Sequence, residues 1–439
     1  MHRRRSGSGR VVLPRVIVRR SSAGAPPGGR VLVLGVLCVV AAVNLIDRQL
    51  ITILLDPIKR EFHASDTLMG LLTGLSFSLV YVTAALPIAR WSDRGIRRNV
   101  IAGCIGVWGA MTMLCGFASS YAQLAAARMG VAVGEAGYNP AAHSMIADLF
   151  PLRHRGAAFG AFNAAASIGI GFGLFCGGWL NAHFAWRTVF IIVGAPCLIL
   201  ALLVRFFLSE PQRGFWDPPA LLQPAPTWRE TIARLAGLRS FRFLALSSMT
   251  CAFINYGMQV WIATFFIRVH GIGVGQVGLK LGLASALGLL AGTICSGTLA
   301  DRLGSRDVRW YMRISGIGML LTMPFGLLTL TTASTGLSFI YYCVTIGLLA
   351  SWASPIHAMT QAIAEPRMRG IAAAIVGFCL NLVGYGLGPV FVGALNDQLQ
   401  PRFGVQSVRY SLMLLLAGCM VAAIVCFSTN RSIREDLRA

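Results

Sequence analysis

The stretch ARWSDRGIRR, residues 89–98, follows a long apolar segment, and the similar stretch GTLADRLGSR, residues 297–306, follows another apolar segment 208 residues later. A second pair repeats the pattern: FPLRHRGAAFGAFN at 150–163 resembles EPRMRGIAAAIVGF at 365–378, with the Arg-Gly dipeptides 214 residues apart. Landmarks at a nearly constant offset indicate that the chain contains a duplicated structural unit.

The apolar segments around these landmarks predict an all-α membrane protein. Hydrophobic residues make up 56% of the 439 residues and charged residues only 12%, whereas soluble domains average about 25% charged residues. Each segment is long enough to cross a bilayer as a helix. Twelve such segments occur, at about 31–55, 67–91, 99–118, 121–149, 156–182, 188–208, 241–267, 276–300, 309–333, 336–363, 370–395 and 406–428.

The segments divide into two predicted six-helix bundles, 31–208 and 241–428, joined by a proline-rich and charged linker at 209–240. Residues 1–30 and 429–439 are predicted to be cytoplasmic tails, the first of them disordered. With both termini inside, 29 of the 38 basic residues fall on the cytoplasmic side and seven on the other. This imbalance follows the positive-inside rule, so we expect a multi-pass protein of the cell inner membrane.

Composition also excludes several functions. The net charge of +22 is distributed between apolar segments as orientation charge, so we expect no nucleic-acid partner. The eleven cysteines lie within apolar segments and form no C-x-x-C pair, which argues against a metal site. We expect no cofactor, and the sequence lacks the Gly-rich loop typical of ATP-driven proteins. No arrangement of catalytic side chains indicates an enzyme.

Two of the predicted spans carry ionisable residues deep in the membrane, where such residues are costly and usually functional. Arg128 and Glu135 lie two turns apart on one face of the fourth span, and Asp47 lies at a similar depth in the first. We predict that Asp47, Arg128 and Glu135 form an acid–base–acid cluster that serves proton coupling or contacts a substrate. The alternative is a static ion pair that holds the two helices together. Arg48 points about 100° away from Asp47 and is expected to contact another helix or to snorkel.

A central cavity between the bundles is predicted to bind the substrate. The first half supplies charges, whereas the second half supplies aromatic and amide groups without a mid-membrane carboxylate, a division that suits a polar head and an apolar body. For each aromatic residue, packing is the alternative interpretation. The predicted cavity residues are Asn44, Tyr138, Asn139, His143, Asn255, Tyr256, Gln259, Trp261, Trp352 and His357.

Acidic and basic residues recur together at the cytoplasmic ends of related spans. They predict a cytoplasmic gate held closed by ion pairs, with plain orientation charge as the alternative. The predicted gate residues are Asp93, Arg94, Arg97, Arg98, Asp148, Arg153, Arg155, Asp301, Arg302, Arg306, Glu365 and Arg369. Runs of glycine at 169–178 and 384–388 are predicted to let helices approach closely, as packing, as a hinge, or as both.

At these motifs the chain resembles the major facilitator superfamily. The segment Asp93-Arg94-x-x-Arg97-Arg98 is similar to the signature between the second and third helices, with Ala89 and Ser92 where glycines are usual. More specific similarity to the Spinster-like branch rests on four motifs: Asn44-x-x-Asp47-Arg48, Arg128-x-Gly130-Val131-x-Val133-Gly134-Glu135-Ala136, Ile146-Ala147-Asp148-Leu149-Phe150 and Trp261-x-x-x-Phe265-x-x-Arg268. The similarity extends over almost the whole chain from about residue 31.

The resemblance implies two bundles, alternating access, and transport of lysolipid- or sphingoid-like amphiphiles with proton coupling through Asp47, Arg128 and Glu135. We therefore expect a proton-coupled secondary transporter, monomeric, whose partners are a small molecule, protons and membrane lipid. The alternatives are an organic-anion or multidrug carrier of the same superfamily and a non-transporting membrane sensor.

Overall fold

The computed structural model describes residues 29–216, 228–365 and 368–436. Residues 1–28 of the predicted tail, 217–227 of the predicted linker and 437–439 of the second tail lie outside the described residues. The described chain is helical. The helices are α1 (Arg30–Phe62), α2 (Asp66–Thr73), α3 (Leu75–Arg94), α4 (Arg97–Cys115), α5 (Tyr121–Ala136), α6 (Tyr138–Leu149), α7 (Leu152–His183), α8 (Trp186–Phe207), α9 (Trp228–Gly237), α10 (Arg239–His270), α11 (Val274–Gly304), α12 (Trp310–Thr331), α13 (Thr335–Ala350), α14 (Ala353–Ile363), α15 (Arg369–Cys379), the π-helix η2 (Leu380–Leu387), α16 (Gly388–Phe403), the short 3-10 helix η3 (Gly404–Gln406) and α17 (Ser407–Asp436).

These helices make twelve membrane crossings. Ten stretches of the described chain are long and apolar enough to span a bilayer, and the last of them, Arg369–Asn430, is 62 residues long and covers two crossings. The charged helices α5 and α6 together make the remaining one. The twelve crossings confirm the all-α membrane fold.

The fourth and tenth crossings are broken at related positions. The fourth breaks at Gly137, so that Pro140 is the third residue of α6, and the tenth breaks at Ser351–Trp352, so that Pro355 is the third residue of α14. Proline is tolerated in the first turn of a helix because the N–H it lacks would have no partner there. The equivalent prolines make the duplication visible in the structure.

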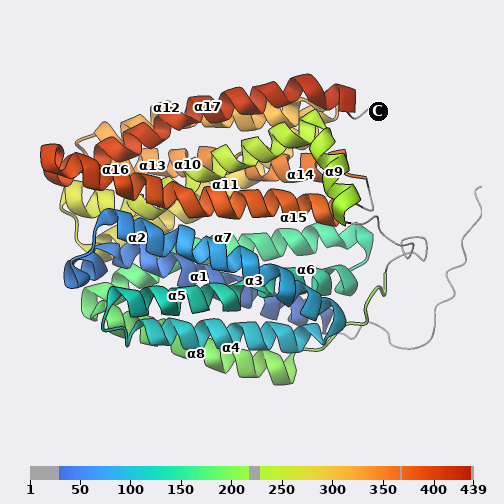
Figure 1. Cartoon of the computed structure of the whole chain (residues 1–439), viewed down its shortest axis with the longest axis horizontal. Helices are drawn as coiled ribbons and strands as arrows, with labels where there is room; N and C mark the ends of the chain where they lie inside the picture. The colour runs from blue at the N-terminus through green and yellow to red at the C-terminus, as the bar shows by residue number, and fades with distance from the viewer. Residues whose placement is uncertain (1–28, 217–227, 366–367, 437–439) are drawn as a thin grey trace, which may run out of the picture.

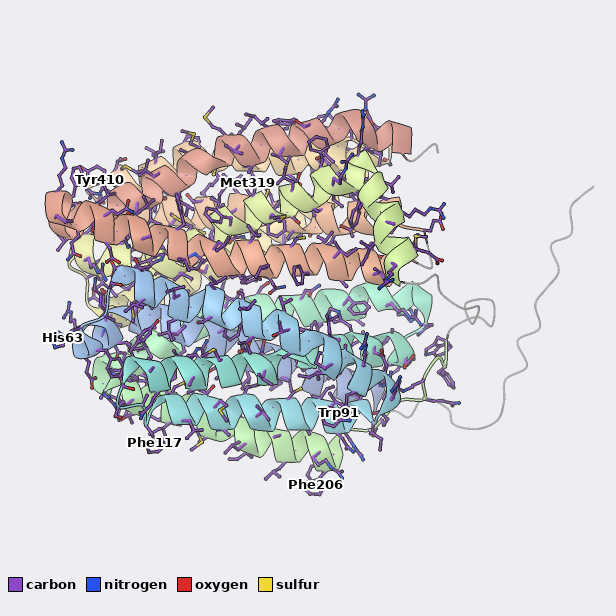
Figure 2. All side chains as sticks on the ribbon, viewed as in Figure 1. His63, Trp91, Phe117, Phe206, Met319 and Tyr410 are labelled. Atoms are coloured by element: carbon purple, nitrogen blue, oxygen red, sulfur yellow. The ribbon has the colours of Figure 1, made fainter. Side chains whose placement is uncertain are left out.

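The helices form two bundles that lie side by side (Figure 1), which we call the N bundle (α1–α8) and the C bundle (α10–α17). One end of the molecule carries α9 and the ends of α8 and α17, and we call it the linker end. We call the opposite end the far end. His63, Phe117 and Tyr410 lie at the far end, while Trp91 and Phe206 lie toward the linker end (Figure 2).

Glycines bring the bundles into close contact, as their spacing predicted. A Cβ added to Gly178 of α7 would lie 2.7 Å from the Cα of Gly278 in α11, and one added to Gly171 would lie 2.6 Å from the carbonyl oxygen of Gly282. Real Cβ atoms do not approach so closely, so any side chain here would push the two helices apart. The α7–α11 contact is therefore a backbone-to-backbone seam between the bundles.

The predicted linker contains structure that its composition did not indicate. Its first residues are tied to the N bundle, since the Gly214 N–H donates to the Asp148 carboxylate at 2.9 Å. Its last part forms the amphipathic helix α9, which buries Leu235 against Phe241, Ala372 and Val376 of the C bundle. Likewise, α17 continues to Asp436, past the predicted end of the last span at 428.

Candidate functional site

Two ion pairs lie at the centre of the N bundle. The carboxylate of Asp47 on α1 accepts a bond from the Thr112 hydroxyl at 2.9 Å and lies 3.5 Å from the guanidinium of Arg128 on α5. Glu135, two turns further along α5, pairs with Arg48 of α1 at 2.8 Å. Both carboxylate side chains are fully buried. Charges so buried are tolerated only when they are paired, so the four side chains form one neutral cluster.

Arg48 is the member of this cluster that the sequence interpretation missed. It was expected to contact another helix or to snorkel, and its partner proves to be Glu135, to which it donates from Nε at 3.1 Å and from Nη2 at 2.8 Å. Arg128 instead pairs with Asp47. The predicted acid–base–acid cluster is therefore an assembly of two acids and two bases, and one oxygen of Glu135, Oε1, has no hydrogen-bond partner.

Aromatic rings lie against both guanidinium groups. The Phe77 ring on α3 lies 4.9 Å from Arg48 and 5.4 Å from Arg128, measured from ring centroid to guanidinium carbon. Arg48 also lies 5.5 Å from the ring of Tyr385, which belongs to the C bundle. These distances are in the range of cation–π attraction. Arg48 thus links the ion-pair cluster of the N bundle to an aromatic side chain of the C bundle.

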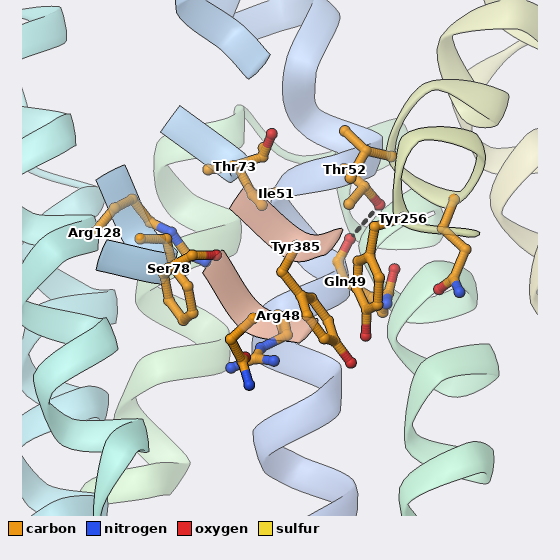
Figure 3. A pocket seen from close by; sticks show the side chains of 13 residues that line it. Arg48, Gln49, Ile51, Thr52, Thr73, Ser78, Arg128, Tyr256 and Tyr385 are labelled. Atoms are coloured by element: carbon orange, nitrogen blue, oxygen red, sulfur yellow. Dashed lines mark hydrogen bonds between the residues drawn. The ribbon is translucent and has the colours of Figure 1, made fainter. Parts of the chain in front are cut away.

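A small central pocket of about 30 Å³ adjoins the cluster, enough room for about two water molecules. Both arginines line it from the N bundle, and Tyr256, Gln259 and Tyr385 line it from the C bundle (Figure 3). Only Tyr256, Gln259 and Arg128 of this set were among the predicted site residues. Phe77, Asn381 and Tyr385 were missed because the sequence does not indicate whether an aromatic or amide side chain in an apolar span faces the pocket or a neighbouring helix.

Several predicted cavity residues lie elsewhere. Tyr138 is buried in the N bundle, where its hydroxyl donates to the Leu37 carbonyl at 2.6 Å. Trp261 is buried in the C bundle, and its Nε1 donates to the Pro389 carbonyl at 2.9 Å. Trp352 is also buried, and its Nε1 has no hydrogen-bond partner. These three side chains do not line the central pocket.

The remaining predicted cavity residues lie around the pocket or nearer the linker end. Asn44 is buried beside the cluster, and Asn255 donates to the Leu349 carbonyl at 3.3 Å while accepting from Gln259. His143 on α6 and His357 on α14 are both exposed, and the His143 ring packs edge-on against Phe159 and Phe162 of α7. Asn139 is half-buried near the start of α6.

An ion-pair network joins the bundles at the far end. Arg268 of α10 contacts two carboxylates of the N bundle, Asp56 at 2.6 Å and Asp66 at 2.6 Å, and Lys59 also contacts Asp66 at 2.6 Å. Asp397 of α16 completes it by accepting the N–H groups of Asp66 and Thr67 at 2.9 and 2.8 Å. A carboxylate is favourable at a helix N-terminus, so Asp397 caps α2 from the opposite bundle.

The predicted gate residues are engaged differently. Arg97 is buried and bonds to Asp148, to Glu210 at 2.8 Å and to the Pro211 carbonyl at 2.7 Å. Arg98 binds Glu210 through its backbone N–H at 2.8 Å. These contacts tie the start of the linker to the N bundle. Asp93 and Arg94 beside them are exposed.

On the other predicted gate loops, the observed contacts lie within the loop or reach helix α9. Arg155 donates to the Phe150 carbonyl at 3.1 Å, and Arg369 to that of Gln361 at 3.0 Å. Glu365 pairs with Arg234 of α9 at 2.6 Å, and Asp301 accepts from the Tyr311 hydroxyl at 3.0 Å, while Arg302 and Arg306 are exposed. The side chain of Arg153 lies outside the described residues. The interbundle ion pairs observed among the described residues are thus at the far end, not among the predicted gate residues.

Comparisons with known proteins agree with this architecture. The profile of the Major Facilitator Superfamily matches residues 37–389. An MFS-type efflux pump of Mycolicibacterium smegmatis is 34% identical over 394 residues, 90% of each chain. The sphingosine-1-phosphate transporter SPNS2 of Danio rerio is 25% identical over 425 residues, covering 90% of this chain and 83% of the relative.

A solved structure gives the same result. The crystal structure of a bacterial homologue of the human lysosomal transporter Spinster, in an inward-facing and unoccupied conformation, is 28% identical and superposes with a TM-score of 0.85. The match covers 94% of this chain and 99% of that one. With its twelve crossings, its duplicated bundles and its central ion-pair cluster, the chain belongs to the Major Facilitator Superfamily and is a Spinster-like membrane transporter.

Proposed function

We propose that this protein is a proton-coupled secondary transporter that moves a small amphipathic or anionic molecule by alternating access. The observation that carries the proposal is the pair of buried ion pairs beside a pocket shared by both bundles. A static clamp would need one ion pair. In the second pair, the guanidinium of Arg48 lines the pocket and is bound to the carboxylate of Glu135, which is fully buried.

The proposed coupling is an exchange at Arg48. A proton taken up by Glu135 removes the charge that holds Arg48, which is then available to an anionic group of the substrate. Loss of the proton restores the ion pair and displaces that group. Arg128 and Asp47 hold the neighbouring charges in place, and Tyr385 transmits the position of Arg48 to the C bundle. Proton binding thereby favours substrate binding at the same cluster, and by reciprocity substrate binding favours proton uptake, which couples the two fluxes.

We further propose that the linker end faces the cytoplasm of a bacterial cell and that the structure is inward-facing. The excess of basic residues at that end supports the orientation. The far-end network around Arg268 supports closure on the outer side, and the matched Spinster homologue adopts an inward-facing conformation. The two bundles, 31–208 and 241–428, are the proposed rocking units. The exposed Asp93 and Asp301 are proposed to close the cytoplasmic side in the opposite state.

The test is flux in proteoliposomes with and without an imposed pH gradient. Glu135→Gln should fold normally and abolish gradient-driven transport, because an amide cannot take up and release the proton. Glu61→Gln is the matched control, since Glu61 is an acid near the end of α1 that pairs at the surface with Arg187. Unchanged gradient-driven accumulation by Glu135→Gln would contradict the coupling role.

A substrate panel separates the two candidate cargoes. The sphingosine-1-phosphate transporter among the relatives favours phosphate-bearing amphiphiles, and the pocket arginines would bind such a head group. The efflux pump, at 34% identity, favours export of drug-like molecules or organic anions. Sphingosine 1-phosphate, a lysophospholipid and a cationic dye should be compared at equal gradients. Transport restricted to the dye would replace the amphiphile assignment with the multidrug one.

A further inference from the structure

A second and larger hollow lies on the C bundle, away from the central pocket. Its volume is about 590 Å³, and it is bounded by α11, α12 and α13. None of its lining residues lines the central pocket. Its rim consists of exposed apolar side chains, among them Leu287 and Leu299 of α11 and Leu321 of α12, which are 62%, 47% and 45% exposed. This groove therefore opens toward the lipid.

Small residues create the groove. A Cβ added to Gly288 would lie 2.5 Å from a methyl carbon of Ile346, and one added to Gly318 would lie 3.0 Å from the Cβ of Ser351. The helices approach closely at these glycines, which line the groove together with the larger apolar side chains of its rim. From Leu287 to Leu299 the groove follows α11 for about 18 Å, close to the roughly 15 Å of one leaflet. Its length therefore matches an acyl chain that descends from one membrane surface.

The mouth of the groove is basic. Trp310 lines the groove where α12 begins, and the guanidinium of Arg313 lies 5.2 Å from its ring. Arg309 precedes it, with a side chain that is 29% exposed and an Nε that lies 3.7 Å from the carboxylate of Asp307. Between residues 298 and 313 there are four arginines and two aspartates. Tryptophan and arginine at this depth are typical of the membrane interface, and the excess positive charge favours an anionic head group.

We propose that this groove binds an anionic phospholipid of the leaflet at the linker end, with one acyl chain along α11 and the phosphate beside Arg309 and Arg313. The site is separate from the transport pathway and does not depend on which cargo the protein carries. A zwitterionic lipid can fill the same groove but lacks the net negative charge that the arginines attract. The site should therefore select by head group.

Photo-crosslinking tests this assignment. The full chain is reconstituted in phosphatidylcholine nanodiscs with a small fraction of phosphatidylglycerol that carries a diazirine in one acyl chain. Crosslinks should map to residues 287–299 and 310–321 by peptide mass spectrometry. Unlabelled phosphatidylglycerol should compete, and phosphatidylcholine should not. Crosslinks spread evenly over the lipid-facing helices, equal competition by both lipids, or chain-to-chain crosslinks across the groove would overturn the proposal.

Matched variants make the result specific. Cys295→Phe places a ring in the groove and should remove most of the crosslinking, whereas Ile294→Phe alters the adjacent residue, which is exposed but does not line the groove. Arg313→Gln should weaken competition by phosphatidylglycerol about fivefold, from roughly 1 kcal/mol per basic residue. Arg242→Gln, an exposed arginine of α10 at the linker end, should leave it unchanged. Equal effects within either pair of variants would also overturn the proposal.

Discussion

Replacing Arg268 by glutamine should open the far end of the protein. Its guanidinium donates four hydrogen bonds to Asp56 and Asp66 of the opposite bundle, at 2.6 to 2.9 Å. Breaking a buried ion pair costs about 3–5 kcal/mol, and Lys59 still compensates Asp66, so the lower value of about 3 kcal/mol applies. If the carboxylates are hydrated when the far end is open, the closed-to-open equilibrium should shift more than 100-fold, since 1.4 kcal/mol corresponds to a factor of ten.

Distance measurement by electron spin resonance can detect this shift. Spin labels at Phe117 and Tyr410 report on the two bundles at the far end (Figure 2), in a background where the exposed Cys295 is serine. Arg268→Gln should move the distance distribution to longer values without substrate. Arg187→Gln is the control, because its ion pair lies within the N bundle, is 32% and 43% exposed, and is worth about 0–1 kcal/mol. A wild-type distribution for Arg268→Gln, or equal widening in both variants, would refute the reasoning.

Three further predictions concern the cluster, the seam and the far-end cap. Arg128→Lys keeps the charge but loses the planar fork, so it should insert and fold yet transport slowly with a shifted pH profile in proteoliposomes; a wild-type rate and profile would make Arg128 a structural clamp. Gly278→Leu should separate α7 from α11 and abolish flux, whereas Gly336→Leu, at a position where an added Cβ meets no neighbour, should not; normal flux in both would exclude a tight seam. Asp397→Ala removes the cap of α2, worth about 1 kcal/mol, and should open the far end in the same spin-label assay by a smaller factor than Arg268→Gln; no change in distance would deny the cap a role in closure.

Local properties of the chain were sufficient to predict its class. Apolar runs of spanning length can only form helices in a bilayer, because every backbone polar group needs a partner there. The duplicated loops predicted two related bundles. Depth along a helix follows from residue number, so Asp47 and Arg128 could be paired from their positions alone.

Partners that depend on how helices are rotated and tilted required the tertiary structure. The position of Arg48 on α1 gives its direction around that helix, but Glu135 becomes its partner only through the rotation of α5. Asp56 and Arg268 are 212 residues apart, and no pattern within either segment relates them. Tyr138 and Trp261 lie in membrane spans, where hydropathy cannot distinguish bundle core from cavity. In such spans packing between neighbouring helices, not water, decides which side chains face inward.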